Sequence, residues 1–350
     1  MNFTLTAGPV SVRPATTSDS IRWDAFVATC AEATFFHRFA WRELYEGVFK
    51  HRTHYLLAER GGELVGVLPL VELRSVLFGH SLCSLPFALY GGVAASDPLA
   101  VPALHGAADA LGAELGVQHL ELRNRVRREP EWPRQDLYVT FRRDIAPDVE
   151  ANLLAIPRKQ RAMVRKSMTR ELRTELDTRA DRFFELYADN QHRHGTPPQS
   201  RRYFDALLEV FGADCEVAIV HSAQGKPVSG VMSFYFRDEV LPYYAGDVVE
   251  ARELAANDFK YWDLMRRACE RKLKVFDYGR SKRDTGSFAF KKNWGFEPQP
   301  LHYEHRLYKV ETIPQNNPSN RKYQAAIAVW RRLPRAAVNA MGPALARHLG

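Results

Sequence analysis

The residues with the clearest chemical potential lie in one stretch, FDYGRSKRDTGSFAFKKNWGF, which runs from Phe276 to Phe296. It begins like the end of a buried strand and closes on aromatic residues around Gly295. It carries five cations against two carboxylates: Arg280, Lys282, Arg283, Lys291 and Lys292 against Asp277 and Asp284. Such a composition fits either a solvated loop or a segment that binds an anion.

Several familiar motifs are present only in fragments. The tetrapeptide DTGS at 284–287 occurs once and follows cations, whereas aspartic-protease chemistry needs two carboxylates that share a proton. No GxxxxGK[ST] spacing exists for a phosphate-binding loop. His192 and His194 have no HExxH pattern or cysteine partner, so no metal site is expected.

A strand, loop, helix and strand over residues 240–279 form a more informative unit. Gly246 near the end of the first strand indicates a bulge or a close approach of a ligand to the backbone. The following helix, with Asn257 as its expected cap, presents unpaired N–H groups that favour a phosphate or carboxylate. Arg252 and Lys260 add positive charge there. The unit predicts a phosphate-containing ligand held between strand and helix.

A basic segment separates the two halves of the chain, with Asp148 able to cap its start. On a helix, Arg158, Arg161 and Arg165 would share one face, because they are three and seven residues apart. This pattern suits either a solvated linker helix or a helix that faces an anion.

The bulk composition sets wider limits. The 350 residues are 45% hydrophobic and 26% charged, with a net charge of +8, which favours anionic partners. The four cysteines lie far apart without a CxxC pair, which favours a reducing compartment. Neither a secretory signal nor an apolar run of ~18 residues is present, so we expect a cytoplasmic protein.

The two halves repeat the order helix, hairpin, strand, helix, strand, which suggests two copies of one α/β unit. We expect a mixed, mainly antiparallel sheet flanked by helices in each unit. The expected domains are 1–145, 146–310 and a basic amphipathic tail over 311–350. In that tail Ala326, Val329, Trp330 and Leu333 can form one stripe, which suits either packing on the chain's own domain or peripheral contact with the inner membrane face.

Four segments in this order resemble the Fem-type peptidyltransferases of the Gcn5-related N-acyltransferase (GNAT) superfamily. They are TFFHRFAWREL, LAAN at 254–257, FDYG at 276–279 and FKKNWGF at 290–296. The basic IPRKQRAMVRK resembles the helix that opens the second acyltransferase unit, and the tail NNPSNRKYQAAIAVWRRLP is similar to the subgroup that accompanies exosortase/PEP-CTERM exopolysaccharide loci.

The resemblance implies two tandem acyltransferase folds with the active cleft in the second unit. It also implies transfer of an acyl or aminoacyl group to an amine, such as an amino sugar in exopolysaccharide or cell-envelope biosynthesis. The co-substrate would be acyl-CoA or aminoacyl-tRNA, with no permanently bound cofactor and no metal. The CoA loop RxxGxG/A of the superfamily is present only as RELAA from Arg252, and no long heptad segment forms the arm of the tRNA-dependent enzymes. Either donor therefore remains open.

Acyl transfer needs an amine freed of its proton and a carbonyl polarised by donors. We expect Asp277 and Tyr244 to be catalytic, although Asp277 can instead cap the following loop. The expected donor or phosphate contacts are Arg252, Asn257, Lys260, Lys291 and Lys292, and the expected acceptor contacts are Arg158, Arg161, Arg165 and Tyr243. Two alternatives are an acyl-CoA-dependent acetyltransferase acting on a small amine, and a non-catalytic adaptor for anionic lipid or nucleic acid. A steep salt dependence of nucleic-acid binding would favour the adaptor.

Overall fold

The computed structural model describes residues 8–314 and 327–348 and divides the chain into two compact units. The first unit ends at Asp136 and is completed by a segment that begins at Leu301. The second runs from Leu137 to Pro300 and is completed by a C-terminal segment that ends at Arg347. Each unit is described by itself.

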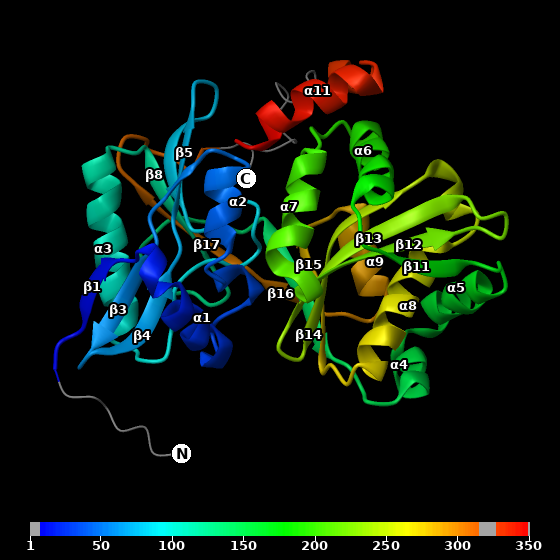
Figure 1. Ribbon diagram of the computed structural model, residues 1–350, viewed down its shortest axis with the longest axis horizontal. Helices are drawn as coiled ribbons and strands as arrows, with labels where there is room; N and C mark the ends of the chain where they lie inside the picture. Colours follow the sequence, from blue (N-terminus) through cyan, green and yellow to red (C-terminus); the bar gives the residue numbers. More distant parts are fainter. Residues whose placement is uncertain (1–7, 315–326, 349–350) are drawn as a thin grey trace. The chain divides into compact units, whose positions relative to one another are not determined.

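The first unit contains two sheets (Figure 1). One has the order β1-β3-β4-β7 and the other the order β2-β5-β6-β8-β17-β9. The strands are β1 Ser11–Pro14, β2 Arg52–Thr53, β3 Leu56–Arg60, β4 Glu63–Leu68, β5 Val71–Ser75, β6 Gly79–Cys83, β7 Ala94–Ala95, β8 His119–Asn124, β9 Arg134–Gln135 and β17 His302–Leu307. The helices are α1 Ser20–Thr29, α2 Trp41–Gly47 and α3 Ala100–Leu115, with short 3₁₀ turns η1 Thr17–Asp19 and η2 Phe35–His37.

The apolar face of α3 forms part of the core of the first unit. Leu104 and Ala108 of this helix pack with Leu120 and Leu122 of β8 in one buried cluster. Because side chains alternate along a strand, the residues between these leucines point to the opposite face of the sheet. The helix ends at Gly116, whose φ of 65° is the left-handed conformation that glycine adopts at helix ends.

The second unit is built on one seven-stranded sheet with the order β11-β12-β13-β14-β15-β10-β16. Its strands are β10 Tyr138–Asp144, β11 Arg173–Asp177, β12 Cys215–His221, β13 Pro227–Phe236, β14 Glu239–Asp247, β15 Val275–Lys282 and β16 Pro298–Pro300. Its helices are α4 Val149–Ala155, α5 Arg158–Met168, α6 Asp181–His194, α7 Arg201–Phe211, α8 Ala256–Glu270, α9 Gly286–Asn293 and α11 Arg335–Ala346, with η3 Gly212–Asp214 and η4 Val249–Arg252.

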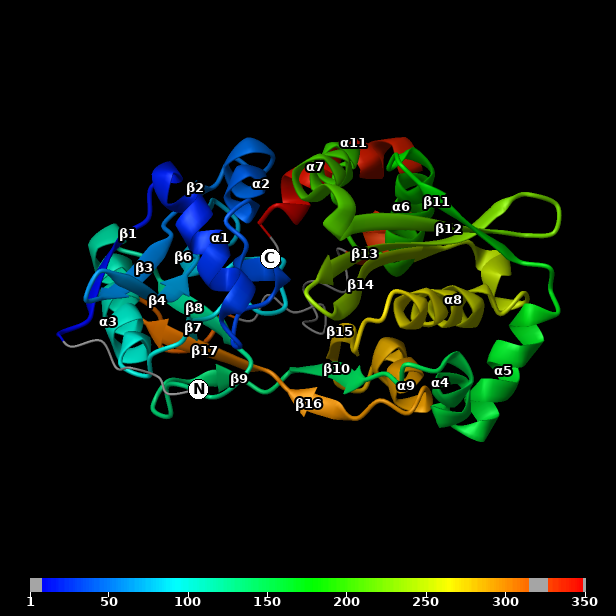
Figure 2. The ribbon, with the colours of Figure 1, turned by 60° about the horizontal axis from the view of Figure 1, so that its bottom comes forward.

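Helices cover both faces of this sheet (Figure 2). On one face, residues of α4, α5 and α8 pack with Phe276 and Tyr278 of β15 and with Trp294. On the other face, α6 packs on β13 and β14, where Gly230 lies against Phe183 and Leu186. All neighbouring strands are antiparallel except β14 and β15. The expected mixed, mainly antiparallel sheets flanked by helices are confirmed.

Most expected elements are present. In the first half the expected hairpin is β3–β4, which turns at Gly61 and Gly62, and in the second half the repeated order gives β12, β13, β14, α8 and β15. Asp148 caps α4 by accepting a hydrogen bond from the N–H of Ala151 at 2.7 Å. The basic segment forms two helices rather than one, because it is interrupted at Pro157, which precedes α5.

Three expectations differ from the structure. Asn257 does not cap α8, because the helix begins at Ala256 and the cap position is Ala255, with φ of 51°. The segment after β15 is not only a loop, because α9 forms within it, capped by the hydroxyl of Thr285. The first unit ends near residue 136 rather than 145, because β10 pairs with β15 and belongs to the second sheet.

The C-terminal segment is described from residue 327 onward, so Ala326 lies outside the described residues. In α11, Val338 is fully buried and Gly342 lies against Pro198 of the second unit. Arg335 forms an ion pair with Glu185 of α6 at 3.0 Å. This helix therefore packs on its own unit. The expected stripe lies before it, where Val329 is exposed and Trp330 and Leu333 are partly buried, so the two alternatives for that stripe both stay predictions. Among the described residues, no helix combines the length and the apolar character that crossing a membrane requires.

Candidate functional site

The candidate site is where two neighbouring strands of the second unit separate. Strands β14 and β15 run parallel and pair only at Glu239–Val275 and Val240–Phe276. Beyond these pairs β14 continues to Asp247 and β15 continues to Lys282, without further pairing between them. The edge of β14 that faces β15 is therefore outside the sheet's ladder over its second half.

A bulge lies on β14 at the same level. Met232 of β13 pairs with Tyr244, and the next residue, Ser233, pairs with Pro242, so Tyr243 is the extra residue. Bulges re-aim side chains and interrupt pairing, and they are frequent beside active sites. The two tyrosine rings lie perpendicular, 4.6 Å apart between centroids, and both are half-buried.

Tyr244 points to the α6–α7 face of the sheet. Its hydroxyl lies 3.0 Å from the hydroxyl of Tyr203 in α7, and its ring packs edge-on against Phe204. Burial and the neighbouring hydroxyl of Tyr203 hold the pKa of Tyr244 well above its usual range. Tyr244 therefore stays protonated at neutral pH and can donate a hydrogen bond.

The end of β14 is fixed by close packing and by an internal ion pair. A methyl group at Gly246 would collide with the backbone of Leu186 and Tyr187 in α6. The close approach expected at this glycine is therefore made by a helix and not by a ligand. Lys260 is only 2% exposed, and its ammonium lies 2.8 Å from Asp247, which also accepts a hydrogen bond from Ser229. The positive charge of Lys260 is thus already paired within the unit.

The start of α8 is the second component of the site. No side chain caps the helix at Ala255. Asp258 in its first turn accepts hydrogen bonds from Gln160 of α5 and from Trp294, the latter at 3.2 Å. Burial raises the pKa of Asp258. Of the two remaining residues expected here, Asn257 is partly buried in the first turn and Arg252 is exposed at the end of η4.

Asp277 holds a bulge in β15. Its Oδ1 accepts hydrogen bonds from the N–H of Gly279 at 2.8 Å and from the hydroxyl of Thr140 at 3.3 Å. Arg142 of β10 lies 4.0 Å from its other oxygen, and the residue is 2% exposed. Gly279, with φ of 69°, lies where the pairing with β10 shifts register. These contacts fit the alternative in which Asp277 caps the loop. They fit less well with an exposed base.

Lys291 lies in α9 and contacts the same bulge of β15. Its ammonium donates to the carbonyl of Gly279 at 3.0 Å and to that of Arg280 at 2.9 Å. Burial lowers the pKa of Lys291 to about 7, although the charge of Asp277 opposes the shift. An uncharged Lys291 can keep both hydrogen bonds with its two N–H groups and still offer a lone pair. Lys292 is exposed, so only the second of the two lysines faces solvent.

The cations of α5 form a third component. Arg158 and Arg165 are exposed, while the partly buried Arg161 donates to the carbonyl of Leu154 at 2.8 Å. The helix is joined to the start of α8 through the bond between Gln160 and Asp258. The structure thus places these cations on the element next to the start of α8, whereas Tyr243 belongs to the β14 bulge.

Sequence reasoning missed three polar groups of this region: Tyr203, Asp247 and Asp258. Each acts through a partner that is distant in sequence, at Tyr244, Lys260 and Gln160 respectively. Only Asp247 carried a local signal, because it follows Gly246 at the end of an apolar strand.

Comparisons with known proteins agree with this topology. Residues 156–292 match the model of the acetyltransferase (GNAT) domain family, which covers the α5–α9 region. This part of the second unit is therefore similar to the acetyltransferase (GNAT) domain family. No curated protein is significantly similar in sequence.

Solved structures show the same fold at low identity. The crystal structure of FemX is 15% identical over 85% of this chain and 98% of its own, with a TM-score of 0.64. The C-terminal domain of a putative lysylphosphatidylglycerol synthetase from Agrobacterium fabrum is 13% identical over 89% and 94%, with a TM-score of 0.57. A tandem GNAT protein from the clavulanic acid biosynthesis pathway is 13% identical over 87% and 100%, with a TM-score of 0.52. The tandem GNAT-like architecture is thereby confirmed.

Proposed function

We propose that this chain is an N-acyltransferase whose second unit moves an acyl or aminoacyl group from an activated donor to an amine. The observation that carries the proposal is the two-pair ladder between β14 and β15, after which the strands separate. An exposed strand edge binds extended ligands by adding their amide groups to its own hydrogen-bonding pattern. A donor with amide groups, such as an acyl-CoA, would lie along β14 from Leu241 onward.

The start of α8 would hold the charged part of the donor. Unpaired N–H groups at a helix start favour phosphate. Arg252 is exposed just before this helix and can pair with a phosphate, whereas Lys260 is engaged by Asp247. The carbonyl to be attacked would then lie near the bulge at Tyr243, where backbone donors can polarise it.

The chemistry needs a group that takes a proton and a group that gives one. In our proposal the acceptor nitrogen attacks the donor carbonyl carbon, and the bond from that carbon to the leaving sulfur or oxygen breaks. The proton lost by the amine passes to Nζ of Lys291, directly or through one water, because an amine with a pKa of about 7 is partly neutral at neutral pH. The leaving atom takes a proton from the hydroxyl of Tyr244, which Tyr203 orients. Asp277 positions the β15 bulge.

We expect an anionic acceptor, because α5 carries exposed cations and its Gln160 donates a hydrogen bond to Asp258 at the start of α8. A nucleotide-linked amino sugar of exopolysaccharide or cell-envelope biosynthesis, as in the exosortase-associated subgroup, has this chemistry. The likeness to FemX and to a lysylphosphatidylglycerol synthetase domain supports testing an aminoacyl-tRNA donor beside acyl-CoA. The description of the matching family as an acetyltransferase domain favours a second candidate, acetyl-CoA-dependent transfer to a small amine.

The test begins with donor binding. Thermal unfolding would be followed with CoA thioesters, with charged tRNA and with nucleotide-sugars, since a ligand that binds only the native state raises the midpoint. The donor that shifts it is then assayed for transfer to nucleotide amino sugars and to small amines by mass spectrometry. We expect an acylated amine as product.

Two variant pairs refine this test. Replacing Lys291 by Met should abolish transfer, while Lys274→Ala, which removes an exposed lysine paired with Asp238 before the start of β15, should change the rate little. A joint Arg158→Ala and Arg165→Ala change should raise KM for an anionic acceptor and leave a neutral amine unaffected. If the double variant and the wild type had the same KM for the anionic acceptor, the small-amine candidate would be favoured. No shift and no product with any donor class would overturn the acyltransferase proposal.

A further inference from the structure

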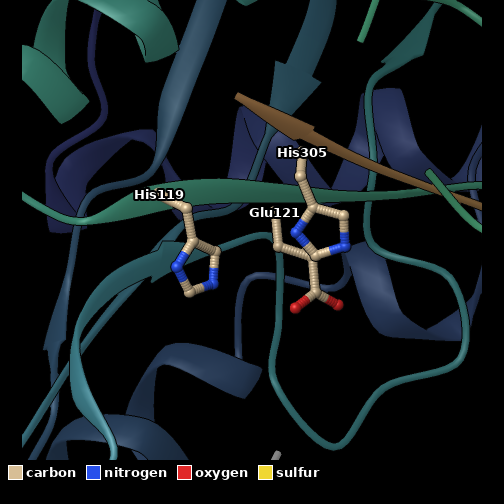
Figure 3. A group of neighbouring side chains, drawn as sticks. All are labelled: His119, Glu121 and His305. Atoms are coloured by element: carbon tan, nitrogen blue, oxygen red, sulfur yellow. The ribbon is translucent and has the colours of Figure 1, made fainter. Parts of the chain in front are cut away.

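Three side chains of the first unit lie together away from the site described above. His119 and Glu121 are on β8, two residues apart, and His305 is on the neighbouring strand β17. In the antiparallel pairing His305 is directly opposite Glu121. The three side chains therefore project from the same face of the sheet, opposite the face that Leu120 and Leu122 pack against α3 (Figure 3).

The chemistry of this cluster is that of a metal site. One ligand atom from each residue can be chosen so that all lie within 4.8 Å of one another. Two imidazoles and one carboxylate are a common ligand set for zinc, which leaves a fourth position open. Tetrahedral ligands at 2.0–2.2 Å from zinc are roughly 3.4 Å apart, so small side-chain rotations would close the site.

Unsatisfied polar atoms provide a second, independent observation. His305 is 2% exposed, and neither of its ring nitrogens has a hydrogen-bond partner among the described residues. Nδ1 of His119 is also buried without a partner in that part of the chain. Buried polar atoms are rarely left unpaired, and each one needs an explanation such as a missing ion or water. Two imidazoles with unpartnered buried nitrogens flank one carboxylate, which points to a shared cation.

The carboxylate is already oriented for such a role. Oε1 of Glu121 accepts a hydrogen bond from Nε of Arg123 at 2.7 Å, and Arg123 is itself held by the carbonyl of Ala88 at 2.9 Å. The second oxygen of Glu121 is then left to serve as a ligand. Metal-ligating carboxylates are commonly fixed by such an outer hydrogen bond.

We propose that His119, Glu121 and His305 bind a divalent transition-metal ion of the zinc type within the first unit. The ion would join β8 to β17, which are 180 residues apart between Asn124 and Glu304. Its role would be to hold the returning strand β17 in the first sheet. This inference does not depend on the acyltransferase proposal, because the three residues belong to the other unit.

The experiment uses the full chain without an affinity tag, freed of metal with a chelator and titrated with ZnCl₂ by calorimetry and by thermal unfolding. We expect one equivalent to bind and to raise the unfolding midpoint. His119→Gln and His305→Leu should each weaken binding by at least about 100-fold, since changes of outer partners alone cost 10–100-fold. The metal-free His305→Leu variant should be as stable as the wild type or more so, because it removes two unpartnered nitrogens.

The control is His80→Gln, which removes another histidine–glutamate pair of the first unit, with 2.8 Å between Nε2 of His80 and Glu72. It should keep the zinc-dependent shift. If the wild type shows no shift, the proposal is wrong. It is also wrong if the shift survives in both His119→Gln and His305→Leu, or if it is lost instead on joint replacement of His192 and His194. Circular dichroism of each metal-free variant verifies folding, and His119→Gln alone decides if His305→Leu does not fold.

Discussion

At the scale of single residues, Lys291 is the most informative group, because the effect of its burial on stability can be measured without a substrate. Its pKa is near 10.5 in the unfolded chain and about 7 in the folded one, so between these values the unfolded chain binds more protons. The free energy of unfolding should therefore rise with pH across this window, by up to about 4 to 5 kcal/mol from this group. Below pH 7 the lysine is charged in both states, and the cost of burying the charge is complete.

This effect can be measured by chemical denaturation of the wild type and of Lys291→Met. The pH values would run from about 6.5 to about 10.5, which spans that window. The variant has no titrating group at position 291, so its free energy of unfolding should rise less with pH than that of the wild type. Lys292→Ala is the matched control and should follow the wild type. Parallel curves for Lys291→Met and the wild type would show that Lys291 titrates normally.

Asp277 gives a second prediction at this scale. Its carboxylate holds the bulge through Gly279 and Thr140. Asp277→Ala should lower the free energy of unfolding by about 1–3 kcal/mol, because a buried N–H loses its acceptor. Asp277→Asn keeps an oxygen for Gly279 and should be closer to the wild type in stability. If it also kept full kcat in the transfer assay, a role of Asp277 as the base would be ruled out.

At the scale of elements, the contact between β14 and α6 determines how the tyrosines of the bulge are held. Gly246→Ala would place a methyl group against the backbone of Leu186, so α6 must move. Overpacking of this kind costs roughly 1–3 kcal/mol. Gly106→Ala is the control, because nothing lies within 4 Å of its added methyl group in α3, and it should stabilise the chain by about 0.5–1 kcal/mol. Urea denaturation compares the two, and equal midpoints would contradict the packing account.

The elements also show what local sequence can predict. Strands and helices with a regular apolar pattern, such as β12, β13 and α7, were identifiable from that pattern. The helix α9 could not be identified in this way, because Gly286 at its start and its two lysines interrupt the apolar pattern. Its cap, Thr285, is of a usual type. The divergence of β14 and β15 has no local signal at all, because it depends on which strands become neighbours.

At the scale of the whole molecule, the chain returns to its first unit after completing most of the second. Strand β17 pairs with β8, and Glu304, which is fully buried, accepts hydrogen bonds from Asn124 and from the N–H groups of Arg128 and Glu129. Such long-range pairing could not be predicted from either segment alone. It is also why the first unit is not a continuous stretch of sequence.

Glu304→Ala should therefore destabilise the first unit more than an exposed change would. It leaves three donors without their acceptor, at a cost of about 1–3 kcal/mol each before any relaxation. Hydrogen exchange should show faster exchange in β8 and β9 and little change in β12 and β13. Replacement of the exposed Glu311 is the control, and an equal effect in both units would contradict the division of the chain.

The central claim is that the second unit transfers an acyl group to an amine, with the donor held along β14 where β15 separates from it. The most direct measurement is mass spectrometry of amine acceptors incubated with the full chain and each donor class, acyl-CoA and aminoacyl-tRNA. The account predicts an acylated amine with at least one donor, formed by the wild type and by Lys274→Ala but not by Lys291→Met. Absence of any acylated amine with both donor classes, from a folded chain, would contradict it.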